Sequence, residues 1–269
     1  MNTITSRDNQ WIKLACSLKH KKGRLDNQCV FVEGMRIVVD AADNGLHDAV
    51  CFVSPKESDS EEFSSLYEKG NQLGWTFFAV TDSVYDKIKD TKSPQGIAAM
   101  IPFFDYTFST LPSIDANQVV VYLQEIQDPG NLGTILRTAA AANAGAVFLS
   151  EGSVDVYNDK TIRGAMGAIF KIPVIQGVTE EELQSFCASQ GRTIYGTAAS
   201  GTVSYEKADY NRPVVVALGN EGNGLCDDFL KNCGEVVTIP MCSNTESLNL
   251  SMSVGLILYK IWECHAFNV

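Results

Sequence analysis

Short apolar strands alternate with helices over the second half of the chain, and few folds accommodate such an alternation. Strands are predicted over residues 119–123, 146–149, 192–197, 214–218 and 235–239, and helices over 133–144, 160–168, 180–190, 226–232 and 249–264. Residues 214–218 read Val-Val-Val-Ala-Leu, and a strand without polar side chains is typical of the centre of a parallel sheet. Because strands that alternate with helices form parallel sheets, we predict a parallel-sheet α/β domain over residues 118–269.

The first part of the chain predicts a second, smaller α/β domain over residues 1–105. Strands are expected at 30–32, 49–53, 75–80 and 96–101, with helices between them. The first helix is expected over 9–22, because apolar side chains there recur at helical spacing, and Gly23 is expected to end it. Residues 106–117 contain several serines and threonines and show little periodicity, so we predict that they link the two domains.

Composition narrows the class of protein. No apolar run is long enough to span a bilayer, and the first residues carry no signal-peptide core, so we expect a cytoplasmic protein. The eight cysteines form no Cys-x-x-Cys pair, and no histidine lies near them at a metal-binding spacing. We therefore expect reduced thiols and no bound metal.

The charge is unevenly distributed along the chain. A net charge of −11 argues against nucleic-acid binding, yet one acidic residue stands against six basic residues over residues 1–24. A basic arm on an acidic body is a plausible contact for nucleic-acid phosphates, and a solvated amphipathic helix is the alternative. The basic residues that we expect to contact RNA are Arg7, Lys13, Lys19, Lys21, Lys22 and Arg24.

Three polar or glycine-bearing segments follow predicted strands, at 131–137, 219–225 and 239–251. Ligands of open parallel sheets bind beyond the carboxyl ends of the strands, where these segments would lie. Asn131 is the expected N-cap of its helix, and Arg137 is a lone cation on an alanine-rich helix, where it contacts either a surface carboxylate or an anionic substrate. The glycine-rich segment lacks both the dinucleotide fingerprint and the Walker A pattern, so each segment alone is also compatible with an ordinary turn or cap.

Taken together, the three segments resemble the signature motifs of the SpoU/TrmH RNA 2′-O-ribose methyltransferases of the SPOUT superfamily. The motifs are Asn-x-Gly-x-x-x-Arg at 131–137, Gly-Asn-Glu-Gly-Asn-Gly-Leu at 219–225, and Ile-Pro-Met with Ser-Leu-Asn-Leu-Ser across 239–251. One departure is Ser243, where many relatives have glycine. Residues 1–105 resemble the family's L30e-like RNA substrate-binding domain through 9–13, Phe-Val-Glu-Gly at 31–34 and Pro-Gln-Gly-Ile at 94–97.

The resemblance implies S-adenosylmethionine as cofactor, a deep trefoil knot in the second domain, and a homodimer formed through that domain. The residues it places on the catalytic side are Arg137, Asn131, Glu221, Ser247 and Asn249. The residues expected to bind the cofactor are Thr197, Ala198, Gly219, Asn220, Gly222, Ile239, Pro240, Met241, Leu248 and Ser251. Arg137 is also expected to contact RNA, with Asn131 orienting it.

The expected reaction is methylation of a ribose 2′-hydroxyl in structured RNA, with ribosomal RNA favoured over transfer RNA by analogy with relatives of this size. A guanidinium remains protonated at ordinary pH, so we expect Arg137 to bind phosphate and stabilise charge on oxygen rather than act as a base. The alternatives are a methyltransferase of the same fold that modifies a base, and a non-catalytic RNA-binding protein that kept the fold.

Overall fold

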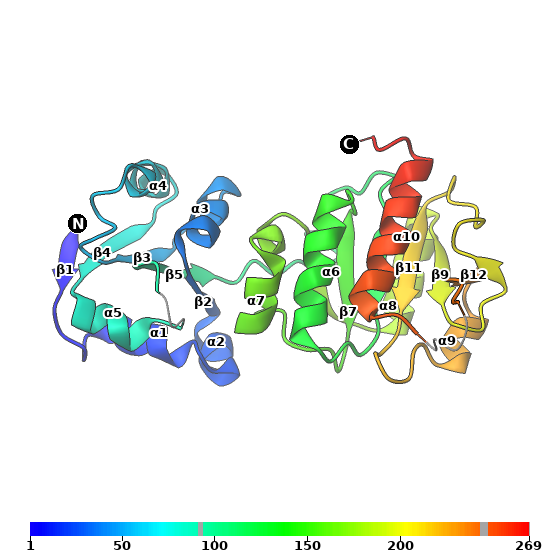
Figure 1. Cartoon of the computed structure of the whole chain (residues 1–269), viewed down its shortest axis with the longest axis horizontal. Helices are drawn as coiled ribbons and strands as arrows, with labels where there is room; N and C mark the ends of the chain where they lie inside the picture. Colours follow the sequence, from blue (N-terminus) through cyan, green and yellow to red (C-terminus); the bar gives the residue numbers. More distant parts are fainter. Residues whose placement is uncertain (91–93, 243–246, 269) are drawn as a thin grey trace. The chain divides into compact units, whose positions relative to one another are not determined.

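The structure is a computed structural model that describes residues 1–90, 94–242 and 247–268. It divides into two compact units, Met1–Phe104 and Asp105–Val269, coloured blue to cyan and green to red in Figure 1. Within the described ranges, no helix combines the length and the apolar character needed to cross a membrane. Ser243, noted above as a departure from the family motif, lies outside the described residues.

The first unit is built on a five-stranded sheet with the order β1-β4-β3-β5-β2. The strand β5 runs antiparallel to both of its neighbours, whereas the remaining pairs are parallel. Its strands are β1 (Asn2–Ile4), β2 (Cys29–Glu33), β3 (Val50–Val53), β4 (Thr76–Val80) and β5 (Ile97–Pro102). Its helices are α1 (Gln10–Ser17), α2 (Lys21–Asn27), α3 (Met35–Asp43), α4 (Glu61–Gln72) and α5 (Asp82–Ile88).

The helix expected over residues 9–22 is wrong, because two helices, α1 and α2, occupy this part of the chain. The Asn9 side chain accepts a hydrogen bond from the Trp11 backbone N–H and caps α1, which ends at Ser17. Gly23 lies inside α2, and a Cβ atom there would overlap the backbone carbonyl of Ser17. The glycine therefore permits a close approach of α2 to the end of α1 rather than stopping a helix. The strand β1 and the helix α2 were not predicted.

The second unit contains a seven-stranded sheet in which every pair of neighbours is parallel, with the order β10-β12-β9-β11-β6-β7-β8. Its strands are β6 (Val120–Leu123), β7 (Ala146–Ser150), β8 (Val174–Val178), β9 (Thr193–Thr197), β10 (Val203–Ser204), β11 (Val214–Leu218) and β12 (Glu235–Thr238). The predicted parallel α/β fold is confirmed, and the all-apolar strand β11 lies at the middle of the sheet. The knot remains an expectation, because the 239–251 connection includes residues outside the described ranges.

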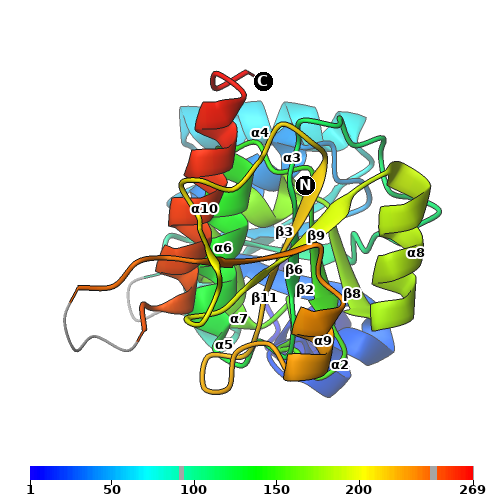
Figure 2. The same cartoon turned by 90° about the vertical axis from the view of Figure 1, so that its right-hand side faces the viewer.

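Helices cover both faces of this sheet. They are α6 (Pro129–Ala141), α7 (Asp159–Ala165), α8 (Glu180–Gln190), α9 (Asp227–Lys231) and α10 (Leu250–Cys264), with a short 3-10 turn at Ala168–Phe170. Figure 2 shows α6 and α10 on one side of the strands and α8 and α9 on the other. On the side of α8 and α9, Tyr122 of β6 stacks on Phe229 of α9 with ring centroids 5.6 Å apart.

The segment 106–117, expected as a linker, is anchored on the second unit. The Phe108 ring contacts Phe148 and Phe186, with centroid distances of 5.3 and 5.7 Å. The buried guanidinium of Arg192 donates hydrogen bonds to the carbonyl oxygens of Gln118 (2.7 Å) and Asp115 (2.9 Å). These contacts hold the segment against the sheet that carries the polar segments singled out above.

Candidate active site

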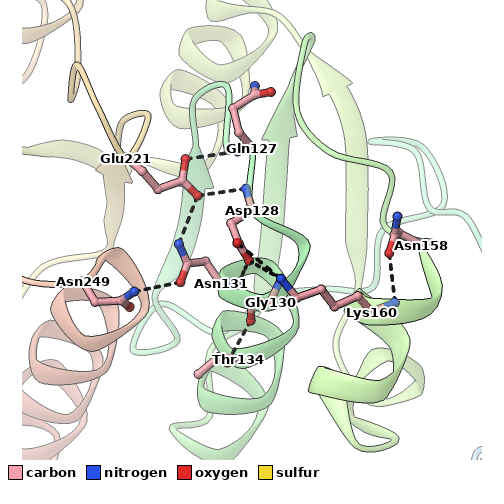
Figure 3. A network of polar contacts seen from close by, with 9 residues as sticks. All are labelled: Gln127, Asp128, Gly130, Asn131, Thr134, Asn158, Lys160, Glu221 and Asn249. Atoms are coloured by element: carbon pink, nitrogen blue, oxygen red, sulfur yellow. Dashed lines mark hydrogen bonds and ion pairs between the residues drawn. The ribbon is translucent and has the colours of Figure 1, made fainter.

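The three polar segments converge at the carboxyl ends of parallel strands of one sheet. The helix α6 begins shortly after β6, the glycine-rich loop 219–225 follows β11, and residues 239–249 connect β12 to α10. Side-chain hydrogen bonds join the segments in the order Glu221, Asn131, Asn249, as Figure 3 shows. Segments separated by about ninety to more than one hundred residues therefore meet at one end of the sheet.

The carboxylate of Glu221 holds the start of α6. Its Oε1 accepts hydrogen bonds from the Asn131 side-chain amide and from the Asp128 backbone N–H, both at 3.1 Å. Its Oε2 accepts one from the Gln127 backbone N–H, also at 3.1 Å. Partial desolvation raises the pKa of Glu221, but these hydrogen bonds outweigh it, so the pKa lies below the ordinary value. The carboxylate is therefore ionised at neutral pH and accepts from all of its partners.

The network has a fixed direction. Because the Glu221 carboxylate only accepts, the Asn131 amide nitrogen must face it, and the Asn131 oxygen is left to accept from the Asn249 amide at 3.0 Å. The Asn249 oxygen then caps α10, accepting from the backbone N–H of Ser251 at 2.9 Å and from its hydroxyl at 2.6 Å. Turning either amide around would oppose acceptor to acceptor at one contact and donor to donor at the other.

The cap of α6 differs from the prediction. Asp128, not Asn131, is the N-cap, and its carboxylate accepts from the backbone N–H groups of Gly130 and Asn131, with Pro129 as the first helical residue. The hydrogen bond from the Asn131 backbone is the main cause of the lowered pKa of Asp128, and Lys160, 3.4 Å away, adds to it. Since Asp128 supplies the cap, the Asn131 side chain is free to join the network. A proline at the first helical position was the available sequence signal.

Arg137 lies further along α6 and is exposed. No hydrogen bond or ion pair joins its guanidinium to another residue in the described ranges, so the alternative of a surface salt bridge has no support there. Asn131, expected to orient Arg137, makes its side-chain hydrogen bonds to Glu221 and Asn249. Gly133 allows α6 to approach α7 closely, because a Cβ atom there would lie 2.6 Å from the carbonyl oxygen of Thr161 on α7.

A cleft of about 580 Å³ opens beside the network. Ten residues predicted for the cofactor or the catalytic side line it, namely Thr197, Ala198, Gly219, Asn220, Glu221, Gly222, Ile239, Met241, Ser247 and Leu248. Asn131, Arg137 and Asn249 are not part of its lining. Pro240 lines an adjoining hollow that shares Ile239, Met241 and Leu248 with the cleft. Ser251 is buried, and its hydroxyl is engaged by Asn249.

The glycine-rich loop is held in shape by its own contacts. The Asn220 side chain accepts from the Gly222 backbone N–H at 2.8 Å and donates to the Glu125 carbonyl at 2.9 Å. A Cβ atom on Gly219 would overlap the backbone of Gly224, so only glycine fits at the start of this loop. The close turn leaves backbone groups of the loop facing the cleft, where they can contact a ligand at short range.

The lining of the cleft suits a nucleoside that carries positive charge. Leucine and isoleucine side chains from β11, the 239–249 segment and α10 provide apolar surface, while threonine, serine and asparagine provide polar groups. The described lining contains no lysine or arginine, and its charged residues are Glu221 and Asp227. A cleft of this size that combines apolar surface and polar groups in about equal parts can hold a small polar cofactor, and the absence of cations in the described lining disfavours a phosphorylated one. The residues present therefore fit S-adenosylmethionine.

Sequence reasoning missed several groups at this site. The backbone N–H groups of Gln127 and Asp128 are bound by Glu221, and Ser200, Asp227 and Ser253 line the cleft. The backbone donors left no signal in the sequence, because any residue type supplies them. Ser200 follows the strand predicted over 192–197, and Asp227 follows the glycine-rich segment 219–225, so their nearness to predicted strand ends was the available signal.

The basic residues of the first unit are less available than predicted. Arg24 is only 7% exposed and its guanidinium donates to the carbonyl of Leu18 at 3.1 Å, which leaves it poorly accessible to RNA. Lys19 pairs with Asp90 at 2.9 Å, and Lys13 lies 3.8 Å from Asp8. Of the six basic residues predicted to contact RNA, Arg7, Lys21 and Lys22 are exposed and make no ion pair within the described part of the chain.

Comparisons with known proteins agree with this geometry. Residues 118–259 match the model of the SpoU rRNA Methylase family, and residues 9–99 match the MRM3-like substrate binding domain. The chain is 29% identical to the 23S rRNA (guanosine(2553)-2′-O)-methyltransferase RlmP of Bacillus subtilis over 97% of this chain and 99% of that protein. It is 30% identical to an uncharacterized tRNA/rRNA methyltransferase of Synechocystis over 96% of this chain and 92% of that protein.

A solved structure has the same fold throughout. The AdoMet-bound rRNA methyltransferase from Sinorhizobium meliloti superposes with a TM-score of 0.87 at 28% identity, covering 98% of each chain. The likeness therefore extends over both units and includes the unit that carries the cleft.

Proposed function

The chain belongs to the SpoU rRNA methylase family, and from this premise we propose that it transfers a methyl group from S-adenosylmethionine to a ribose 2′-hydroxyl of ribosomal RNA. The observation that carries the proposal is the pairing of Asn131 with Glu221 and Asn249, which joins the three family motifs beside one cleft. The names of the relatives support an RNA substrate, and those of the Bacillus subtilis and Sinorhizobium meliloti proteins specify rRNA.

The cleft supplies the cofactor site in this proposal. Backbone groups around Gly219, Ile239 and Leu248 bind the nucleoside end, and Thr197 and Ala198 close the side formed by β9. Bound there, S-adenosylmethionine would supply an electrophilic methyl group on a sulfonium sulfur. The protein contributes alignment, because holding two reactants in line removes much of the entropic cost of their meeting.

Arg137 is the group that we assign to the RNA. It is exposed on α6, without a partner in the described ranges, and it carries a fixed charge in an acidic protein. We assign it to a phosphate next to the target ribose and to stabilisation of the negative charge that develops on the attacking oxygen. We assign a positioning role to Glu221, Asn131 and Asn249, because their side chains form hydrogen bonds with one another and with the backbone.

We propose a homodimer through the second unit. The side chains of Met252, Leu256 and Tyr259 are 59%, 39% and 45% exposed, and their spacing places them on one stripe of α10. Leu248, 38% exposed at the rim of the cleft, extends this apolar surface to the cofactor site. An apolar surface of this kind favours association with a second copy. Light scattering would give twice the chain mass if the proposal holds and the mass of one chain if it does not.

The first unit is proposed as the RNA-binding module, in line with its match to a substrate binding domain. Arg7, Lys21 and Lys22 are its available cations among the residues predicted for this role. An acidic chain with few free cations binds RNA weakly through charge alone, so shape and unpaired bases carry more of the recognition.

The test is transfer of a labelled methyl group from S-adenosylmethionine to total RNA taken from cells that lack this protein. We expect the label in ribosomal RNA with the parent protein and none with the Arg137→Ala variant. Label in transfer RNA alone would contradict the substrate assignment, and an absence of label from every RNA would favour the non-catalytic alternative.

A further inference from the structure

One carboxylate in the cofactor cleft makes no hydrogen bond or ion pair within the described part of the chain. The charged residues of the described lining are Glu221 and Asp227. Glu221 is bound by Asn131 and by two backbone N–H groups, as described above. Asp227 is exposed, lines the cleft, and makes no hydrogen bond or ion pair within the described part of the chain. Its charge is therefore available to whatever fills the cleft.

Asp228, the next residue in the sequence, provides a comparison for Asp227. Asp227 and Asp228 are the first two residues of α9, so both suit the positive end of a helix. Asp228 is not among the residues that line the cleft, and it pairs with Lys231 at 2.8 Å. Both residues lie in the first turn of α9, so both can stabilise the helix end. That role does not explain why Asp227 lines the cleft without an ion pair.

The reaction changes the charge of the molecule in the cleft. When the ribose oxygen bonds to the methyl carbon, the carbon–sulfur electron pair stays on sulfur and the hydroxyl proton leaves to solvent, so a sulfonium becomes a neutral thioether. The donor thus carries one more positive charge than the product, S-adenosylhomocysteine, while the two share nearly all other atoms. A carboxylate near the sulfur distinguishes the two by charge alone.

We propose that Asp227 makes the cleft prefer the cationic methyl donor to its neutral product, which favours exchange of spent for fresh cofactor. The inference rests on the proposed function. A unit charge several ångströms from a solvated carboxylate changes affinity by roughly three- to tenfold. Added salt screens such a preference, because both groups are accessible to solvent.

Calorimetry on the full chain tests the proposal. The dissociation constants of S-adenosylmethionine, S-adenosylhomocysteine and sinefungin, whose amine replaces the sulfonium with another cation, are measured for the parent, Asp227→Asn and Asp228→Asn. We expect Asp227→Asn to weaken S-adenosylmethionine and sinefungin by roughly three- to tenfold at low salt and to leave S-adenosylhomocysteine within about twofold. The matched Asp228→Asn variant should leave the donor-to-product ratio unchanged.

The outcomes distinguish a failure of the Asp227 proposal from a failure of the proposed function. Equal weakening of all three compounds by Asp227→Asn would show an uncharged contact and overturn the proposal, as would an unchanged ratio or an equal effect of Asp228→Asn. Thermal melting of each variant identifies any loss of folding, and Asp227→Glu should restore the preference if charge is the cause. Failure of the parent protein to bind any of the compounds would instead overturn the proposed function.

Discussion

Replacing Glu221 with glutamine tests whether the carboxylate holds the three segments together. Glutamine has nearly the same shape but offers one acceptor oxygen and one donor nitrogen where Glu221 accepts three hydrogen bonds. The amide nitrogen must therefore face at least one N–H group from Gln127, Asp128 or Asn131. Because these bonds are exposed to solvent, the loss is that of an ordinary hydrogen bond, about 0.5–1.5 kcal/mol. For a chain of this size that corresponds to a fall in Tm of roughly 1–6 °C.

The stabilisation by Glu221 should also change with pH in a defined direction. Because the pKa of folded Glu221 is lowered, its ionised form stabilises the fold at and above the pKa of the unfolded chain. This contribution is lost as the pH falls through the lowered folded-state pKa. The difference in Tm between parent and Glu221→Gln should thus be full at pH 7 and shrink on acidification below about pH 4.

Differential scanning calorimetry at several pH values provides the measurement. Glu151→Gln is the matched control, because Glu151 is exposed in the same unit and its carboxylate makes no hydrogen bond or ion pair in the described ranges. The control should melt with the parent at every pH. If Glu221→Gln also melts with the parent at pH 7, the carboxylate does not hold the start of α6 and the reasoning is refuted.

Three further predictions concern the reaction and its partners. Arg137→Ala should lower methyl transfer by about 10²–10³-fold with cofactor affinity unchanged, and Arg137→Lys should rescue little if planar contact with phosphate matters; transfer at the parent rate would remove the assignment. Gly219→Ala should cost about 1–3 kcal/mol and weaken cofactor binding, since its Cβ atom overlaps Gly224; unchanged melting and affinity would contradict the close approach. Reversing Lys21 and Lys22 to glutamate should weaken RNA binding and lower the slope of log affinity against log salt by about 2 in filter binding, whereas binding like the parent's would leave them without a role.

Local signals predicted much of the second unit. The helix expected over 180–190 matches α8, which has three acidic residues in its first turn; the structure adds a capping box at Thr179 and Glu182 and a left-handed Gly191 after its end. The strand expected over 214–218 matches β11, because five apolar residues have no other place than the middle of a covered sheet. Both elements are determined by residues that are close to one another in the sequence.

Features set by distant contacts were predicted poorly. Gly23 was read as the end of a helix, although its small size is needed where α2 approaches Ser17. At the site, the sequence supplied the three segments but not their partners, since the bonds from Asn131 to Glu221 and Asn249 span 90 and 118 residues. Such pairs follow from the order of the strands, and sequence spacing alone does not give that order.

The chemical form of the methylated product tests the central claim most directly. Ribosomal RNA methylated by the protein with labelled S-adenosylmethionine is hydrolysed completely in alkali and the fragments are separated by size. A 2′-O-methyl group removes the hydroxyl that alkali needs for cleavage, so the account predicts that the label elutes with an alkali-resistant dinucleotide. Label recovered in mononucleotides would place the methyl group on a base and contradict the account.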